Sequence, residues 1–123
     1  MKILIIDDEP DILELMSQEF RYRGHSVETA SSGNEAVEIL TRNFFDVVLS
    51  DFKMPNGNGI TVLNFVNTLH PRPQFYFASG QADMSVDECL KKGALDFFHK
   101  PFDLDHLVLK IEKSLPKIGL LEL

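Results

Sequence analysis

The chain has 123 residues, the size of one compact domain with a single core. Hydrophobic residues make up 44% of it and charged residues 25%, and no stretch approaches the roughly 18 consecutive apolar residues of a membrane span, so the composition favours a globular domain over a membrane protein. The formal net charge of −7, without a cluster of Lys and Arg, excludes direct nucleic-acid binding by this chain.

The start of the chain and its one cysteine support two further expectations. Met1 is followed directly by strand-forming residues instead of the basic and apolar regions of a signal peptide, so we expect a cytoplasmic location. Cys89 cannot form an internal disulfide and lies beside Val86 and Leu90 in the apolar stripe of a predicted helix. We expect a buried, unreactive thiol there.

Short apolar runs alternate along the chain with longer segments of helical periodicity. This alternation predicts five strand–helix units and a parallel sheet with helices on both faces. The predicted strands cover residues 2–6, 26–30, 45–50, 74–78 and 95–99. The predicted helices run from Pro10 to about Gly24, from after Ser32 to about Asn43, over about 60–66, over about 83–92, and from after Pro101 to before Pro116.

Local signals mark several boundaries of these elements. Pro10 suits the first turn of a helix, and Ser32 with Glu35 forms a capping-box pattern. Gly and Asn in the stretch 54–59 tolerate positive φ and predict a loop. The Lys100–Pro101 bond is a candidate for the cis form. The predicted inward face of the first helix consists of Ile12, Leu13, Leu15, Met16 and Phe20.

Polar side chains stand where the predicted strands end. Asp7 and Asp8 follow the first strand and Asp51 follows the third, while Ser79 and Lys100 follow the fourth and fifth. Ligands in open parallel sheets bind outside the carboxyl ends of the strands. We therefore expect these five residues to converge on one crevice.

The predicted cluster has the composition of a phosphate and metal site. Packed carboxylates repel one another unless a cation compensates them, and Mg2+, with Mn2+ as an alternative, suits two or three acidic ligands. Asp51 is the best candidate nucleophile, because a carboxylate can accept a phosphoryl group. Lys100, the hydroxyl of Ser79 and the backbone N–H at Gly80 could then contact the phosphoryl oxygens.

Short motifs occur at these strand ends in a specific order. They are Asp7-Asp8-Glu9-Pro10, Asp51-Phe52-Lys53-Met54-Pro55 with Gly57 and Gly59, Ala78-Ser79-Gly80, Gly93-Ala94, and Phe97-Phe98-His99-Lys100-Pro101-Phe102. In this order the sequence resembles the receiver domain of two-component response regulators over about residues 1–115, which leaves 116–123 as a C-terminal tail or linker stub. The resemblance implies a flavodoxin-like, doubly wound α/β fold with five parallel strands in the order 2-1-3-4-5 and five helices.

The resemblance also implies a chemistry for the cluster. Asp51 would accept a phosphoryl group from the phosphohistidine of a sensor histidine kinase or a phosphotransfer protein. Asp7, Asp8, Asp51 and the backbone carbonyl of Lys53 would bind Mg2+, and Lys100 would contact the phosphate. The chain would act as a signalling switch that promotes only its own phosphotransfer and dephosphorylation, and not as an enzyme.

A switch needs residues that carry the change away from the site. By the same resemblance, the hydroxyl of Ser79 swings towards the phosphoryl group and the aromatic ring of Phe97 turns inward behind it. The surface of the fourth helix, fifth strand and fifth helix then changes, and controls an output domain, a downstream protein or a homodimer. Because Phe97 lacks a hydroxyl, its two positions would differ mainly in apolar burial. We hypothesise that Lys53, with Gln81 at the mouth of the site, hinders the water that hydrolyses the acyl phosphate.

Two other function classes remain open from the sequence. A phosphorylation-independent interaction module could share the fold. That alternative is weakened because none of the acidic, hydroxyl and lysine positions expected of a phosphorylated switch is missing. A phosphohydrolase with an aspartate nucleophile would need an Asp-x-Asp pattern that Asp7-Asp8-Glu9 does not supply. His25 and His99 lack metal-ligand spacing and are expected to face solvent. The apolar tail 117–123 could dock on the domain, form dimers or begin a linker.

Overall fold

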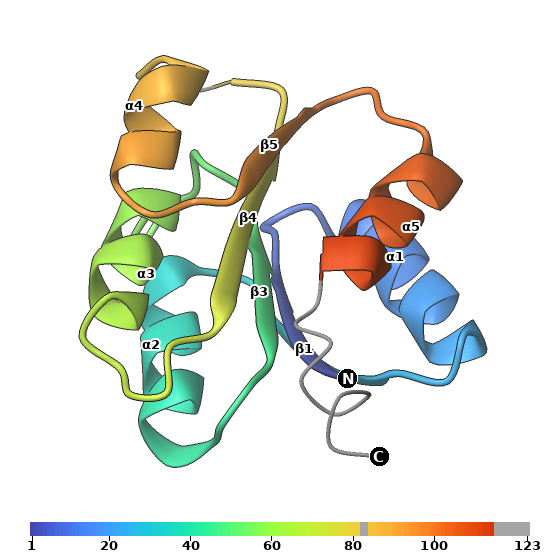
Figure 1. The fold of residues 1–123 in the computed structure, drawn as a ribbon, viewed down its shortest axis with the longest axis horizontal. Coiled ribbons are helices and arrows are strands. Elements are labelled where there is room, and N and C mark those ends of the chain that lie inside the picture. The colour runs from blue at the N-terminus through green and yellow to red at the C-terminus, as the bar shows by residue number, and fades with distance from the viewer. Residues whose placement is uncertain (82–83, 115–123) are drawn as a thin grey trace.

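The computed structural model describes residues 1–81 and 84–114 (Figure 1). The strands are β1 (Lys2–Ile6), β2 (Ser26–Ala30), β3 (Val47–Ser50), β4 (Gln74–Ser79) and β5 (Asp96–His99). The helices are α1 (Pro10–Tyr22), α2 (Gly33–Arg42), α3 (Gly59–Val66), α4 (Val86–Lys91) and α5 (Leu104–Ser114). The predicted tail 117–123 lies outside the described residues.

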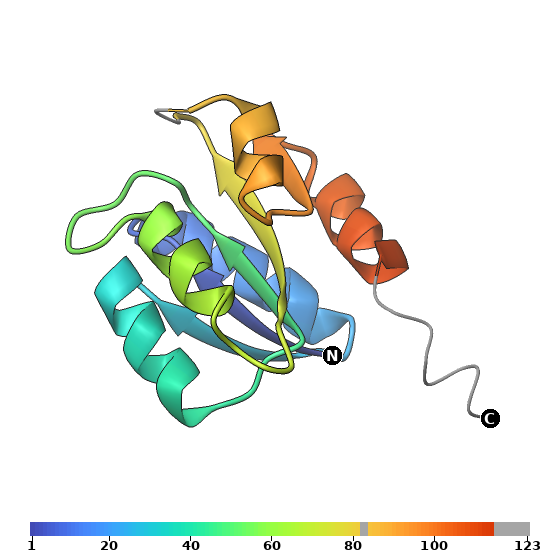
Figure 2. The same cartoon turned by 60° about the vertical axis from the view of Figure 1, so that its left-hand side comes forward.

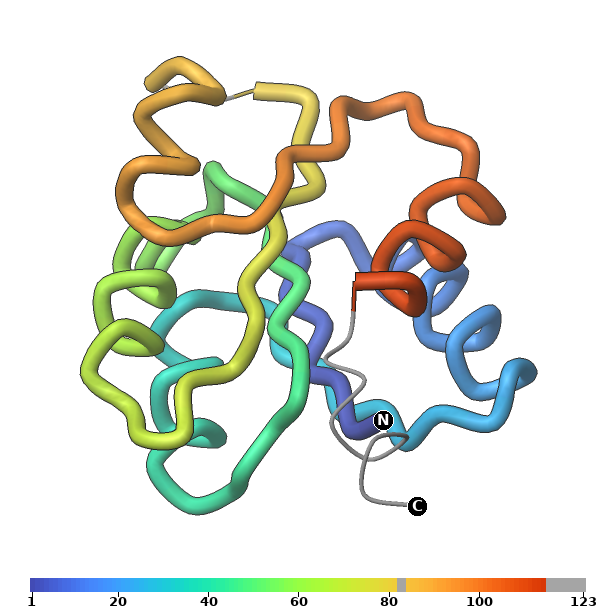
Figure 3. The backbone as a smooth tube through the Cα atoms, in the orientation of Figure 1, coloured from blue at the N-terminus to red at the C-terminus, as the bar shows by residue number. Residues whose placement is uncertain are grey.

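The five strands form one parallel sheet in the order β2-β1-β3-β4-β5, which confirms the predicted fold. Helices α1 and α5 cover one face, and α2, α3 and α4 cover the other (Figures 1 and 2). The chain trace shows β1 and β3 side by side in the middle of the sheet (Figure 3). Helices on both faces bury both sides of the sheet, which explains why its central strands are continuous apolar runs.

Alternate residues of each central strand enter two separate cores. Val48, Phe75 and Phe77 pack under α2, α3 and α4, together with residues such as Leu63. On the opposite face, the strand residues Leu49, Tyr76 and Ala78 pack against α1 and α5. The sheet is thus held rigidly between two apolar layers, so the carboxyl ends of its strands form a fixed platform.

The fourth helix differs from its predicted range. It begins at Val86 instead of Asp83, because Ser85 and Glu88 form a full capping box in which the Ser85 side chain accepts from Glu88 N. Asp83 itself lies outside the described residues. The prediction that Leu15 and Leu90 face inward is also wrong, since Leu15 is 53% exposed and Leu90 is 39% exposed.

His25 is not solvent-facing, contrary to the sequence-based expectation. It precedes β2, is partly buried, and its Nε2 lies 2.6 Å from Glu112 Oε2 on α5. Its Nδ1 lies 3.1 Å from the amino nitrogen of Met1. His25 therefore joins the start of the chain to α5, whereas His99 is exposed as expected.

Two other sequence-based expectations agree with the structure, namely the burial of Cys89 and the cis form of the Lys100–Pro101 bond. Cys89 is buried, and burial together with the charge of Glu88 raises the pKa of its thiol. The Lys100–Pro101 bond is cis, as is His70–Pro71, for which no expectation was made. Among the described residues, no helix is both long enough and apolar enough to cross a membrane.

Replacing Phe20 by Ala should lower the free energy of unfolding by about 3–5 kcal/mol, because its ring is fully buried against the sheet. Urea unfolding followed by circular dichroism measures this change. Tyr22→Ala on the same helix is the matched control, since Tyr22 is 88% exposed and its loss should change stability by less than about 0.5 kcal/mol. Equal effects of the two substitutions would contradict the assignment of the core.

Candidate functional site

Backbone hydrogen bonds of the sheet continue one residue beyond β1 and β3. Asp7 N donates to Ala30 O at 3.1 Å, and Asp51 N donates to Ile6 O at 2.8 Å. Because neighbouring strands hold these residues in register, Asp7 and Asp51 leave the sheet side by side. The fold itself therefore forces the two carboxylates together.

A third acid, Asp8, joins this pair. Asp7, Asp8 and Asp51 each offer a carboxylate oxygen within 4.8 Å of the others. Asp7 is fully buried and Asp51 is 6% exposed, whereas Asp8 is exposed. Like charges at such distances repel one another, and burial removes the water that would screen them.

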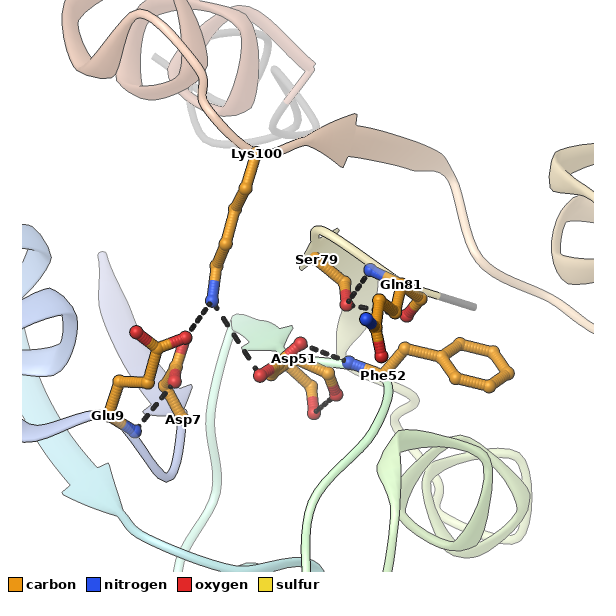
Figure 4. Close-up of polar contacts among 8 residues, drawn as sticks. Asp7, Glu9, Asp51, Phe52, Ser79, Gln81 and Lys100 are labelled. Atoms are coloured by element: carbon orange, nitrogen blue, oxygen red, sulfur yellow. Dashed lines mark hydrogen bonds and ion pairs between the residues drawn. The ribbon is translucent and has the colours of Figure 1, made fainter. Parts of the chain in front are cut away.

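Lys100 reaches this cluster from the end of β5 (Figure 4). Its Nζ lies 2.9 Å from Asp7 Oδ2, 3.4 Å from Glu9 Oε1 and 3.6 Å from Asp51 Oδ2. Burial would lower the pKa of Lys100, but the hydrogen bond to Asp7 and the three nearby carboxylates outweigh it and raise the pKa. Lys100 is thus a fixed positive charge at neutral pH.

This single positive charge does not neutralise Asp7 completely. Burial raises the pKa of Asp7 above its ordinary value, and the charge of Asp51 adds to this effect. The hydrogen bonds from Lys100 and from the backbone of Glu9 act in the opposite direction without cancelling the rise. The folded protein therefore disfavours the ionised form of Asp7.

Backbone N–H groups fix one oxygen of each buried acid. Glu9 N donates to Asp7 Oδ1 at 2.9 Å, and Phe52 N donates to Asp51 Oδ1 at 2.8 Å. The second oxygen of both acids then faces Lys100 (Figure 4). Each carboxylate is therefore held in one orientation before any ligand arrives.

The cluster opens onto a cleft of 390 Å³ at the carboxyl end of the sheet. Its lining residues are Asp8, Glu9, Asp51, Lys53, Ser79, Gly80, Gln81 and Lys100. The structure thus brings together residues from the ends of β1, β3, β4 and β5, as the topology predicts. A polar cleft of this kind suits a small, strongly charged group better than an apolar ligand.

The two predicted phosphate contacts at the end of β4, Ser79 and Gly80, differ in how they are held. The hydroxyl of Ser79 donates to Gln81 O at 2.7 Å and accepts from Gln81 N at 3.2 Å, so it is held within its own turn (Figure 4). A Cβ added at Gly80 would lie 3.7 Å from Lys100 Cβ, an ordinary contact. Close packing at this position therefore does not require glycine.

Phe97 lies outside the cleft but next to it. Its ring is 7% exposed, with its centroid 5.7 Å from that of Phe77 and 4.8 Å from that of His99. A hollow of 270 Å³ borders this ring and shares Gly80 and Gln81 with the cleft. The β4 turn thus lies between the acidic site and the predicted switch aromatic.

Sequence reasoning assigned no role to two residues of this site. Glu9 contributes a carboxylate near Lys100 and the N–H that holds Asp7, and its place directly after the acid pair was the available signal. Phe52 acts through its backbone N–H, which no side-chain pattern reveals. Both contacts orient the acids that the sequence identified.

The donor set fits a hard divalent cation. It combines three carboxylates with one ammonium group, so the local charge remains negative after Lys100 is counted. Oxygen ligands of this kind suit Mg2+, which binds few protein groups and retains several waters. Asp7, Asp8 and Asp51 are the side chains that would hold it.

Replacing Asp7 by Asn should raise the free energy of unfolding at neutral pH, without divalent cations, by about 1 kcal/mol. The raised pKa of Asp7 means that the folded wild type binds more protons than the unfolded chain above the ordinary value of about 3.9. Its stability therefore falls as pH rises from that value through the raised one, and the Asn variant should lack this fall. Urea unfolding across this pH range, with a chelator present, measures the difference.

Asp8→Asn is the matched control, because Asp8 is exposed and its charge is screened by water. It should change stability less than Asp7→Asn does. Lower stability of the Asp7 variant at neutral pH would contradict the electrostatic conflict described above.

Comparisons with known proteins agree with this geometry. A family model described as the response regulator receiver domain matches residues 3–112. Sporulation initiation phosphotransferase F of Bacillus subtilis is 36% identical over 94% of this chain and 94% of its own length. The response regulator protein PilR of Pseudomonas aeruginosa is 37% identical over 86% of the chain, and the transcriptional regulatory protein ZraR of Escherichia coli is 34% identical over 92%. The chain spans only 24% of PilR and 26% of ZraR.

Solved structures give the same result. A CheY-like receiver domain from Methanospirillum hungatei has a TM-score of 0.85 and 30% identity, over 93% of this chain and 92% of that one. The CheX–CheY–BeF3–Mg2+ complex from Borrelia burgdorferi has a TM-score of 0.86 and 28% identity, over 95% and 90%. The family model, these relatives and the sheet order agree, so the chain belongs to the receiver domain family of two-component response regulators.

Proposed function

We propose that Asp51 is the phosphoacceptor of a two-component signalling pathway in the cytoplasm. The supporting observation is the position of its carboxylate, which is almost buried and borders the 390 Å³ cleft. Its Oδ2 lies 3.6 Å from Lys100 Nζ. Membership of the receiver family and the similarity to a relative named a phosphotransferase support the same assignment.

The proposed reaction transfers a phosphoryl group from phosphohistidine to Asp51. A carboxylate oxygen of Asp51 forms the new bond to phosphorus, and the histidine nitrogen of the donor leaves with the electron pair of the P–N bond. Oδ2 is the better placed oxygen, because the N–H of Phe52 holds Oδ1. Lys100 stabilises the charge on the phosphoryl oxygens.

Asp7, Asp8, Asp51 and the backbone carbonyl of Lys53 are proposed to bind Mg2+, or Mn2+ as an alternative. The ion would neutralise charge on the transferring group, which like-charged carboxylates would otherwise repel. The Mg2+ and BeF3 named in the Borrelia burgdorferi complex support this ligand chemistry for a similar fold. Gly80 would offer its backbone N–H to another phosphoryl oxygen.

The output would pass through Ser79 and Phe97 to the α4-β5-α5 surface. To contact a phosphoryl group, the hydroxyl of Ser79 would have to break its hydrogen bonds to Gln81. This change would move the turn that borders the hollow beside Phe97. Leu90 on α4, Leu95 directly before β5 and Leu109 on α5 are exposed, which supports binding of an output domain, a downstream protein or a second copy to these elements. Because the chain matches only part of PilR and ZraR, the identity of the output belongs to this proposal.

Incubation with acetyl phosphate and Mg2+ should add one phosphoryl group to the wild-type chain and none to Asp51→Asn, by intact-mass spectrometry. Asp46→Asn is the matched control, since Asp46 lies at the opposite end of β3 and bonds Lys2 N. Beryllium fluoride with Mg2+ should shift the amide resonances around Phe97. Metal binding without either response would favour an interaction module, and continuous release of phosphate from varied esters would indicate a phosphohydrolase.

Replacing Lys53 by Ala should shorten the lifetime of the phosphorylated chain about fivefold. This corresponds to Lys53 raising the activation free energy of hydrolysis by about 1 kcal/mol. Lys53 is exposed and lines the mouth of the cleft, where hydrolytic water must enter. Loss of the phosphoryl group is followed by intact mass after removal of acetyl phosphate. Lys91→Ala on α4 is the control, and an unchanged lifetime for the Lys53 variant would remove the hypothesis.

A further inference from the structure

The first two N–H groups of α2 bond to the loop that follows Asp51. Gly33 N donates to Gly57 O at 2.8 Å, and Asn34 N donates to Asn56 O at 3.0 Å. The opening N–H groups of a helix have no partner within it, and the Ser32 side chain accepts from Glu35 N, which leaves the N–H groups of Gly33 and Asn34 to the loop. The β3–α3 loop, residues 52–58, therefore completes the capping of α2.

This contact requires glycine at position 33. A Cβ there would lie 2.4 Å from Gly57 O, 2.6 Å from Gly57 C and 2.9 Å from Asn58 O. All three are backbone atoms, which cannot move aside by changing a rotamer. Any larger residue must displace the loop or α2.

The other end of the loop is tied to the acidic site. Gly59 N donates to Phe52 O at 2.8 Å, and a Cβ on Gly59 would lie 2.4 Å from Asp51 O. Between these ties, Asn56 and Gly57 have φ of 56° and 97°. The loop thus has a defined path from Asp51 to α2, and Lys53 lies within it.

We propose that Gly33 is a positioning residue. Together with the backbone N–H of Asn34, it places the β3–α3 loop so that the Lys53 carbonyl can bind the divalent cation. This inference rests on the proposed function, in which that carbonyl is a metal ligand. Groups that orient metal ligands affect affinity strongly although they do not touch the ion. Displacement of α2 from the loop would then weaken the site without changing any acidic residue.

The first experiment compares Mg2+ binding to wild type and Gly33→Ala by isothermal titration calorimetry. We expect the dissociation constant to rise about tenfold in the variant. Gly24→Ala is the matched control, because Gly24 has φ of +90° but a Cβ there would meet nothing within 4 Å. It strains the backbone away from the loop, so its Mg2+ affinity should equal that of wild type.

A second pair of variants keeps the test valid if Gly33→Ala does not fold. Asn34→Pro removes the N–H that donates to Asn56 O and places the ring Cδ against that oxygen, at a first-turn position where a helix tolerates proline. It should weaken Mg2+ binding about fivefold. Asn34→Ala keeps that N–H and loses only the side chain, whose Oδ1 lies beside Gly57, so it should bind Mg2+ more tightly than Asn34→Pro does.

The amide resonances of Gly33 and Asn34 provide a readout that fold stability alone would not move. They should shift when Mg2+ is added to wild type, although neither residue is a metal ligand. Unchanged affinity in Gly33→Ala or Asn34→Pro, or an equal loss in Gly24→Ala, would overturn the positioning role alone. A wild-type chain that binds no Mg2+ would overturn the proposed function and this inference together.

Discussion

The conflict among three carboxylates at the end of the sheet is the constraint on which the rest of the structure depends. Sheet register places Asp7 and Asp51 side by side, and burial prevents water from relieving their repulsion. Lys100 and two backbone N–H groups reduce the cost but leave the pKa of Asp7 raised. The two apolar cores hold the sheet rigid enough to maintain this unfavourable arrangement, and a bound divalent cation would relieve the repulsion.

Much of this arrangement could be predicted because it depends on local patterns and general topology. The strand Lys2–Ile6 occurs as predicted, and the Ser32 side chain caps its helix by accepting from Glu35 N. The Glu35 side chain accepts from Ser31 N, so the predicted capping box is only half formed. Once parallel strands are inferred, the positions of Asp7, Asp51 and Lys100 at strand ends follow from the sequence alone. The site was therefore identifiable from residue types and their order along the chain.

The features that were missed depend on tertiary contacts or on the backbone. His25 meets Glu112, a partner 87 residues away, which no local pattern indicates. Leu15 is exposed, although the periodicity of its helix was compatible with an inward position. The apolar pattern alone does not settle which of several neighbouring residues face the core. The N–H of Phe52 orients Asp51 irrespective of its side chain, and Gly33 meets a loop that its own segment does not specify.

The lining of the cleft has a consequence for selectivity. Each of its lining residues within the described part of the chain is charged, polar or glycine, so the cleft is mainly polar and has little apolar surface to distinguish one organic ligand from another. Under the proposed function, a phosphoryl group would be recognised there by charge and by hydrogen bonds from Ser79 and the Gly80 N–H, whichever molecule carries it. If Asp51 accepts a phosphoryl group as proposed, discrimination between the correct donor and its competitors would come from the protein surfaces around the cleft, where contacts to a wrong partner can be unfavourable.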